Sequence, residues 1–240
     1  MFFVNMIYLN RIGCVYMPIF NAQYFEIDKS ETKRYAGLRT SSFKEGIIEE
    51  ACELARLIIK PTGIWNMYDY DPQTQAIGTV PPFKLEGEAI KKHLMDCNKV
   101  IIIAVTVGIE IENQITEMFK KGKYGLSIML DAAATAAVEQ SADLMEKAIK
   151  EQVSRKGYKM KWRFSPGYGD WPMEQQTEML NHAQGEKIGI TLTDSLMLEP
   201  RKSITAIIGL YSNVEKCSDI EQNKSHDCKL CNKIDCPARK

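Results

Sequence analysis

Two stretches of the sequence carry side chains whose types and spacing could do chemistry. The first covers residues 163–172 and reads Arg-Phe-Ser-Pro-Gly-Tyr-Gly-Asp-Trp-Pro. Its prolines fix φ, and its glycines allow the backbone to approach a ligand closely. An irregular loop with a guanidinium and aromatic rings suits a small molecule that has a carboxylate at one end and a flat or cationic part at the other. An ordinary ordered turn that caps a core explains the same residues equally well.

The second stretch is the C-terminal tail, where four of the seven cysteines gather. These four are Cys217, Cys228, Cys231 and Cys236, and His226 lies close to them. A Cys-x-x-Cys turn can bring two thiolates onto one metal, and the remaining residues offer further ligands. The spacing therefore favours a zinc ion or an iron–sulfur cluster. The alternative is a reduced tail without metal, because a second Cys-x-x-Cys pair is missing.

The overall composition gives no global preference for a charged partner. The 240 residues include 31 basic and 31 acidic side chains, so no net field attracts nucleic acid or an anionic membrane. The length fits one domain with appendages. We find no signal peptide and no run of about 18 apolar residues, and an odd cysteine count argues against a secreted disulfide framework. We expect a cytoplasmic protein that binds neither nucleic acid nor membrane.

Hydrophobic periodicity predicts the helices that must position the two stretches. The helix that follows Ser42 and ends before Pro61 has a capping-box start and is the most regular of them. A helix begins near Asp170 and ends near Gly185. The predicted helices cover residues 29–38, 42–60, 86–97, 109–121, 127–155 and 173–183.

The predicted strands are shorter and rich in β-branched residues. The strand over 99–107 is nearly continuous Val, Ile and Ala, which is typical of a strand buried on both faces. Asp71-Pro72 predicts a turn between the first two strands, and Pro200-Arg201 predicts a hairpin between the last two. The predicted strands cover residues 63–70, 76–80, 99–107, 187–192, 196–199 and 202–210. Without regular βαβ alternation, this order predicts an α+β fold with a largely antiparallel sheet.

The long helix over 127–155 carries a charged stripe. Glu139, Asp143, Glu146 and Lys150 repeat at helical spacing along one face. Such a stripe is usually solvated. Periodicity alone therefore predicts that Glu139 is a surface carboxylate and not a ligand-binding one.

Several motifs, taken together and in order, resemble one family. They are Leu85-x-Gly87-x-x-Ile90-x-x-His93-Leu94-x-x-Cys97, residues 100–108, the Ala-rich residues 131–139, Arg163-x-Ser165-Pro166-Gly167-Tyr168 and residues 188–203. On these motifs, the sequence from about residue 20 to 210 resembles the reactivation domain of cobalamin-dependent methionine synthase. The resemblance implies a helmet-shaped α+β domain that binds S-adenosylmethionine, the methyl donor that rescues an oxidised corrinoid.

The resemblance also implies four ligand-binding residues. Arg163 matches the family arginine, which can grip the ligand's carboxylate through a bidentate charged pair. Glu139 matches a helix glutamate that meets the ammonium or sulfonium charge, which replaces the solvated interpretation. Ser165 occupies a position where family members hold adenine with backbone groups, and Tyr168 supplies an aromatic face or a hydroxyl beside it.

The sequence departs from the family in two respects. Full-length methionine synthases carry this domain fused behind substrate and corrinoid modules, whereas here we expect it to recognise its target in trans. The family's cysteine after Pro-Gly-Tyr is absent, and residues 169–171 are Gly-Asp-Trp. We expect a lead over 1–16 that is either untranslated, with Met17 as the start, or disordered. An activation-like domain would cover 17–212, and a cysteine-rich tail without a counterpart in the fused domain would cover 213–240.

The implied function is support of reductive methylation of cobalamin held by the corrinoid-binding module of a methionine synthase. A donor such as flavodoxin or ferredoxin would supply one electron to cob(II)alamin, and methyl transfer from the sulfonium to cob(I)alamin would make that reduction effectively irreversible. An iron–sulfur cluster in the tail could deliver the electron. Two alternatives stay open. One is another corrinoid methyltransferase as the client, and the other is a non-catalytic ligand- or metal-binding interaction module.

Overall fold

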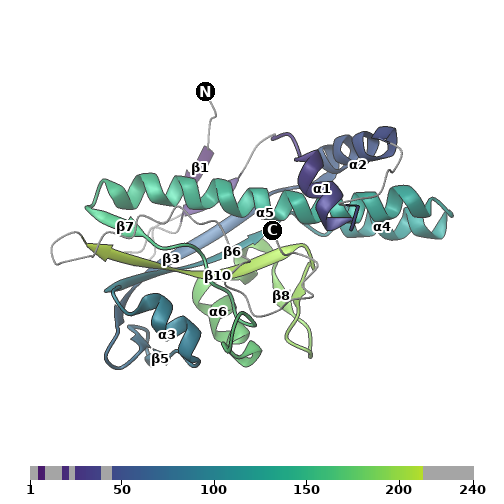
Figure 1. The fold of residues 1–240 in the computed structure, drawn as a ribbon. Coiled ribbons are helices and arrows are strands. Elements are labelled where there is room, and N and C mark those ends of the chain that lie inside the picture. The colour runs from purple at the N-terminus through teal and green to yellow at the C-terminus, as the bar shows by residue number, and fades with distance from the viewer. Residues whose placement is uncertain (1–4, 9–17, 22–24, 39–44, 213–240) are drawn as a thin grey trace.

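The computed structural model describes residues 5–8, 18–21, 25–38 and 45–212 (Figure 1). An antiparallel sheet separates two layers of helices. The long helix α5 (Tyr124–Ser154) covers one face, and α3 (Glu88–Leu94) and α6 (Gln176–Ala183) cover the other (Figure 1). This arrangement confirms the expected α+β fold with a largely antiparallel sheet.

All the strand pairs in the described residues are antiparallel. The main path of the large sheet runs in the order β1-β2-β3-β6-β10-β7, and β4 pairs with both β3 and β5. The strands of this sheet are β1 (Asn5–Tyr8), β2 (Pro18–Asn21), β3 (Thr62–Asp71), β4 (Ala76–Ile77), β5 (Phe83–Lys84), β6 (Lys99–Thr106), β7 (Tyr158–Met160) and β10 (Ser203–Ser212). β1 lies within the expected lead over 1–16, and the cysteine-rich tail lies outside the described residues.

The central strand β6 contributes side chains to the hydrophobic cores on both faces of the sheet. It pairs with β3 on one side and with β10 on the other, and residues 100–106 are buried. Ile101 and Ile103 belong to the core under α5, whereas Val100 and Ile102 belong to the core under α3 and α6. Successive strand residues face opposite sides of a sheet, so a strand covered on both faces must be apolar throughout. The expected doubly buried strand is confirmed.

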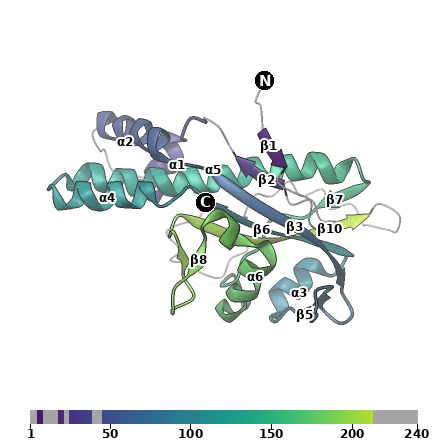
Figure 2. The same cartoon turned by 180° about the vertical axis from the view of Figure 1, so that it is seen from behind.

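The predicted helices all occur, with ends shifted by a few residues. The long helix α5 has buried alanines along its middle, and small side chains allow α1 and α2 to pack closely against it (Figure 2). The remaining helical segments are α1 (Lys29–Tyr35), α2 (Glu45–Ile58), α4 (Glu110–Lys120) and the 3-10 turns Met173–Gln175 and Gly185–Ile188. Within the described ranges, no helix combines the length and the apolar character needed to cross a membrane.

The predicted hairpin between residues 196–199 and 202–210 is wrong. β9 (Leu198–Glu199) pairs with β8 (Thr191–Leu192), and the turn between them closes where Thr193 N donates to Met197 O at 2.9 Å. β10 instead pairs with β6 over eight residues. Its apolar residues 206–210 are fully buried there, which removes far more apolar surface from water than a local hairpin would.

The strand predicted over 187–192 is also wrong in its first half. Residues Gly185–Ile188 form a 3-10 turn, and only Thr191–Leu192 belong to a strand. Gly189 follows the turn with φ of +77°, a left-handed conformation that glycine adopts readily. The alternating apolar pattern of this segment therefore reflects one buried residue, Ile190, and not a sheet position.

Candidate functional site: an arginine held by three carboxylates

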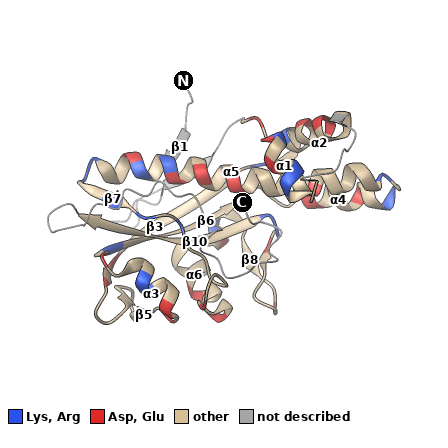
Figure 3. Ribbon diagram, in the orientation of Figure 1, with Lys and Arg blue, Asp and Glu red and all other residues tan. Residues whose placement is uncertain are grey.

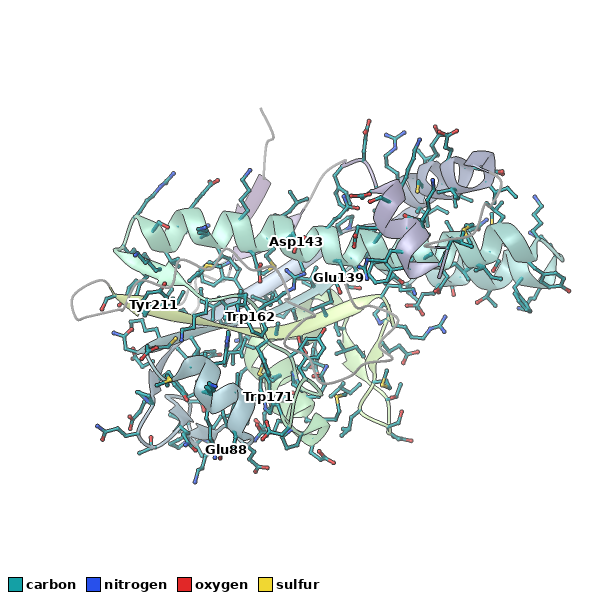
Figure 4. The ribbon with its side chains drawn as sticks, viewed as in Figure 1. Glu88, Glu139, Asp143, Trp162, Trp171 and Tyr211 are labelled. Atoms are coloured by element: carbon teal, nitrogen blue, oxygen red, sulfur yellow. The ribbon has the colours of Figure 1, made fainter. Side chains whose placement is uncertain are left out.

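Three carboxylates of α5 converge on the guanidinium of Arg163. Nη2 lies 2.7 Å from Glu139 Oε2, and Nη1 lies 2.6 Å from Asp143 Oδ1 and 3.2 Å from Glu146 Oε2. Figure 4 shows Glu139 and Asp143 on the long helix, above the segment that carries Trp162. We call Arg163, Glu139, Asp143 and Glu146 the arginine cluster.

Local structure explains why these four residues meet. Positions 139, 143 and 146 are spaced by four and three residues, so they lie on one side of α5. Arg163 belongs to an extended segment beside β10, held by Phe164 N to Ile207 O at 2.9 Å and Ile207 N to Phe164 O at 2.8 Å. Side chains alternate along such a segment. Phe164 is therefore buried in the core under α3 and α6, and Arg163 faces α5.

Burial and charge oppose each other in the arginine cluster. The side chain of Arg163 is 19% exposed and that of Glu146 is 22% exposed, whereas Asp143 is 67% exposed. Burial disfavours the charged guanidinium, but attraction by Glu146, Asp143 and Glu139 outweighs it and raises the pKa of Arg163. Burial raises the pKa of Glu146 although Arg163 acts in the opposite direction. One positive charge facing three carboxylates gives this surface an excess of negative charge, among the mixed charges of α5 (Figure 3).

The segment before α1 packs beside Glu139. The side chain of Gln140 holds this segment at two points, since Nε2 donates to Glu26 O and Oε1 accepts from Asp28 N, both at 3.0 Å. Burial, together with the negative charge of Glu139, raises the pKa of the Tyr35 phenol. The Tyr35 phenol therefore lies near enough to Glu139 to be affected by its charge.

The loop after Arg163 is fixed by its own backbone and by β10. Ser165 Oγ donates to Thr205 O at 2.7 Å, and Gly167 N donates to Trp171 O at 2.8 Å. Gly167 has φ of +85°, and a Cβ there would lie 2.7 Å from the sulfur of Met173. Trp171 is 1% exposed, whereas Tyr168 is 42% exposed. The loop is therefore rigid at its base and presents one phenol ring to the solvent.

Asp170 connects this loop to α3. Its carboxylate accepts from Glu88 N at 2.7 Å and from Ala89 N at 2.9 Å, and these backbone bonds lower its pKa. The first N–H groups of a helix have no partner within the helix, so the carboxylate caps α3 from a distant part of the chain. We expected Asp170 to start the helix over 173–183. Its observed role is different because Gly87, with φ of +99°, leaves the N-terminus of α3 open to it.

An aromatic cluster lies on the other side of the Arg163 segment. The ring of His93 lies 4.3 Å from the ring of Trp162 and 5.3 Å from that of Phe164, measured between centroids. His93 Nε2 is 2.9 Å from Trp162 O. Burial lowers the pKa of His93 to about 4, against the effect of that hydrogen bond. His93 is therefore neutral near pH 7 and serves packing on this side.

A cavity of about 310 Å³ opens between α1, α4 and α5. Tyr35, Phe119, Asp131 and Arg201 are among its lining residues. Asp131 precedes Glu139 by eight residues on α5, which is about 12 Å along the helix axis. The arginine cluster itself does not line this cavity. Tyr35 is the residue through which the two regions adjoin.

The structure brings together some of the predicted site residues and separates others. Arg163 and Glu139 are in direct contact, Ser165 is bonded to β10, and Tyr168 stands at the surface. Four residues near the site were not predicted as site residues from the sequence, namely Asp143, Glu146, Tyr35 and Gln140. The charge repeat of α5 contained the first two, but nothing in it indicated that the stripe faces an arginine.

The cysteines of the chain fall into two groups. Cys52 and Cys97 are buried thiols that pack as small side chains in the two cores. Cys217, Cys228, Cys231 and Cys236 lie outside the described residues, so the metal hypothesis stays a prediction. In the part of the chain that the structure describes, no group of three His, Cys, Asp or Glu side chains is arranged to hold a metal ion.

The family of the chain follows from comparison with known proteins. A family model described as "Vitamin B12 dependent methionine synthase, activation domain" matches residues 89–227, which is more than half of the chain. The chain belongs to this family. The match includes α5 and the loop of the arginine cluster. It also continues past Ser212, where we expected the likeness to the fused domain to end.

A solved structure shows the same fold in another activation domain. The crystal structure of the MetH reactivation domain bound to AdoHcy is similar to this chain, with a TM-score of 0.57 and 13% sequence identity. The similarity covers 88% of this chain and 82% of that chain. No curated protein matches the chain. This activation domain thus shares its fold with a relative whose sequence has diverged widely.

Proposed function

We propose that this activation domain binds S-adenosylmethionine at the arginine cluster and supports, in trans, reductive methylation of the corrinoid of a cobalamin-dependent methionine synthase. The observation that carries the proposal is the contact between Arg163 and Glu139 beside the Arg-x-x-Pro-Gly-Tyr loop. The AdoHcy bound to the MetH reactivation domain belongs to the same class of ligand, which supports this choice.

The arginine cluster fits the charges of that ligand. S-adenosylmethionine has a carboxylate, an ammonium and a sulfonium group. Its carboxylate would take the place of Asp143 on Arg163, because Asp143 is the most exposed partner and can turn into water at little cost. Glu139, which is 36% exposed, would then face the cationic groups. After the exchange Arg163 and the charged groups of the ligand would be paired, and Asp143 would be hydrated.

The loop would hold the adenosine part. Backbone groups around Ser165 are fixed by the bond to Thr205, so they can position a flat base without further ordering. The ring of Tyr168 is 42% exposed and lies perpendicular to that of Phe164, with centroids 6.0 Å apart. A planar ligand can stack there or bond to its hydroxyl.

The contribution of this chain to methyl transfer would be positioning. The sulfonium supplies an activated methyl group when the ligand is bound, so the chain needs to present that group to the corrinoid and hold it in place. An electron donor such as flavodoxin or ferredoxin would supply the electron for the corrinoid on the partner. A cytoplasmic location, where such donors work, is part of this proposal.

Calorimetric titration of S-adenosylmethionine into the wild-type chain and Arg163→Ala tests the binding step. We expect binding to the wild type and a loss of tenfold or more in the variant, with Arg155→Ala, an exposed arginine at the end of α5, as the control. Methylation of an isolated corrinoid module of methionine synthase, with a reductant and labelled ligand, tests the second step. Binding without methylation would leave a ligand-binding module, and absence of binding would overturn the proposal.

A further inference from the structure

The least exposed carboxylate of the arginine cluster is Glu146, which the family resemblance did not single out. Its side chain is 22% exposed, compared with 36% for Glu139 and 67% for Asp143. A carboxylate that is mostly covered turns into water less easily than an exposed one, and Oε1 of Glu146 is buried. When a ligand displaces the outer partners of Arg163, Glu146 is the partner that stays.

The geometry of Arg163 requires such a fixed partner. A guanidinium is a planar fork, and it binds a carboxylate through two parallel bonds only when its plane is correctly oriented. Nη1 of Arg163 is shared between Asp143 and Glu146, and Nη2 faces Glu139. If Asp143 and Glu139 leave, the contact of 3.2 Å from Nη1 to Glu146 Oε2 remains and restrains the orientation of the guanidinium.

Glu146 is poorly explained as a stabilising residue. Its second oxygen, Oε1, is buried and finds no hydrogen-bond partner among the residues that the structure describes. An unsatisfied buried acceptor opposes folding, and a partly buried Arg–Glu pair often adds no net stability over apolar side chains of similar size. A costly arrangement of this kind is typical of functional sites. We therefore look for the role of Glu146 in its effect on the guanidinium of Arg163.

We infer that Glu146 is a positioning residue that holds the guanidinium of Arg163 in the orientation that receives the ligand's carboxylate. The inference rests on the proposed function, because it names a residue of the same site. In this role Glu146 would contact Arg163 and not the ligand. Its effect should therefore be confined to ligands that use Arg163.

The test compares two ligands and two variants of the full chain. S-adenosylmethionine has the carboxylate, whereas 5′-methylthioadenosine keeps the adenosine part and lacks the amino-acid part. We expect Glu146→Met to weaken binding of S-adenosylmethionine about tenfold and to leave 5′-methylthioadenosine binding unchanged. Glu146→Gln keeps an acceptor oxygen for Arg163 and should lose less affinity for S-adenosylmethionine. Glu151→Gln, an exposed glutamate further along α5, is the matched control.

Two further measurements separate positioning from a structural role. The melting temperature of Glu146→Met should be equal to or above that of the wild type, since the variant removes an unsatisfied buried oxygen. In an Arg163→Lys background, Glu146→Met should cause little further loss of S-adenosylmethionine affinity, because an ammonium group has no plane to orient.

The outcomes distinguish this inference from the function on which it rests. If the wild type does not bind S-adenosylmethionine, the proposed function is wrong. If the wild type binds S-adenosylmethionine, three results would show that the positioning role is wrong while the proposed function stands. Glu146→Met could bind S-adenosylmethionine within twofold of the wild-type affinity, or it could lose affinity for both ligands equally. The third result is that Glu146→Met reduces the affinity of the Arg163→Lys variant by the same factor as that of the wild type.

Discussion

The Nη2 atom of Arg163 lies 2.7 Å from Oε2 of Glu139, although the two residues are 24 positions apart and belong to different layers of the molecule. Glu139 lies on the helix that covers the sheet, and Arg163 lies on the extended segment at the sheet's edge. Each residue is therefore placed by its own element. The site forms only when helix and sheet pack together.

Replacing the carboxylate of this pair should weaken binding of the proposed ligand without unfolding the chain. Glu139→Gln removes a charge from a side chain that is 36% exposed, so no core contact is lost. A charged hydrogen bond is worth about 1.5 to 3 kcal/mol, which predicts a tenfold or greater loss of S-adenosylmethionine affinity. Calorimetry measures the loss, and circular dichroism checks the fold. Unchanged affinity in a folded variant would remove Glu139 from the site.

Removing the cap of α3 should loosen the Arg-x-x-Pro-Gly-Tyr loop. Asp170 accepts from Glu88 N and Ala89 N, and no side chain of α3's own N-cap residue, Gly87, can replace it. We expect Asp170→Ala to lower the melting temperature and to weaken S-adenosylmethionine binding. Asp170→Asn should have smaller effects on both quantities. Asp194→Ala, in the exposed β8–β9 turn, is the control. Equal melting curves for all variants would argue against the cap.

His93 should make stability depend on pH between about 6.5 and 4. Its pKa falls from 6.5 to about 4 in the folded chain, chiefly through burial. Below pH 6.5 the unfolded chain binds a proton that the folded chain does not, so acidification favours unfolding. The shift predicts that about 3 kcal/mol of unfolding free energy is lost by pH 4. Urea titrations of wild type and His93→Gln, which keeps a donor for Trp162 O, should diverge over this range.

That prediction has a clear contrary result. His93→Gln cannot titrate, so the difference between its unfolding free energy and that of the wild type should change as the pH falls. A constant difference from pH 7 to pH 4 would show that the pKa of His93 is the same in the folded chain as in the unfolded one.

Two glycines should respond in opposite ways to alanine. A Cβ at Gly209 would lie 2.5 Å from the sulfur of Cys97 and 2.8 Å from Leu94 Cδ2, whereas a Cβ at Gly46 would meet nothing within 4 Å. Overpacking predicts that Gly209→Ala lowers the unfolding free energy by about 1 to 3 kcal/mol. Gly46→Ala, in the first turn of α2, should raise it by about 0.5 kcal/mol. Denaturant titration measures both. A tolerated alanine at 209 would mean that α3 shifts easily.

The cysteine tail gives a prediction that depends on sequence spacing alone. We expect anaerobically purified protein to carry iron and sulfide, with visible absorption that bleaches on reduction and is lost in Cys231→Ser. Cys14→Ser, outside the tail, is the control. Colourless protein with stoichiometric zinc would indicate a structural knuckle instead. Protein that stays metal-free after anaerobic reconstitution would rule out both sites.

Features of this protein that depend on short-range periodicity could be predicted from the amino-acid sequence. The apolar repeats of α2 and α5 and the uninterrupted Val and Ile of β6 each require one kind of burial, so helix, strand and α+β class could be predicted. Turn residues at Asp71-Pro72 likewise predicted the β3–β4 connection. The Arg-x-x-Pro-Gly-Tyr loop pointed to the family because its residues are adjacent in the chain.

Which elements are neighbours depends on long-range packing and could not be predicted from local sequence. β10 pairs with β6 at the centre of the sheet and not with its neighbour in the chain. Burial on both faces removes more apolar surface from water than a short hairpin would. Asp170 caps a helix more than eighty residues away, and Glu146 contacts Arg163 instead of lying on a solvated stripe. A charge repeat states which face of a helix is polar. What that face meets depends on the packing of distant segments, and local sequence does not contain it.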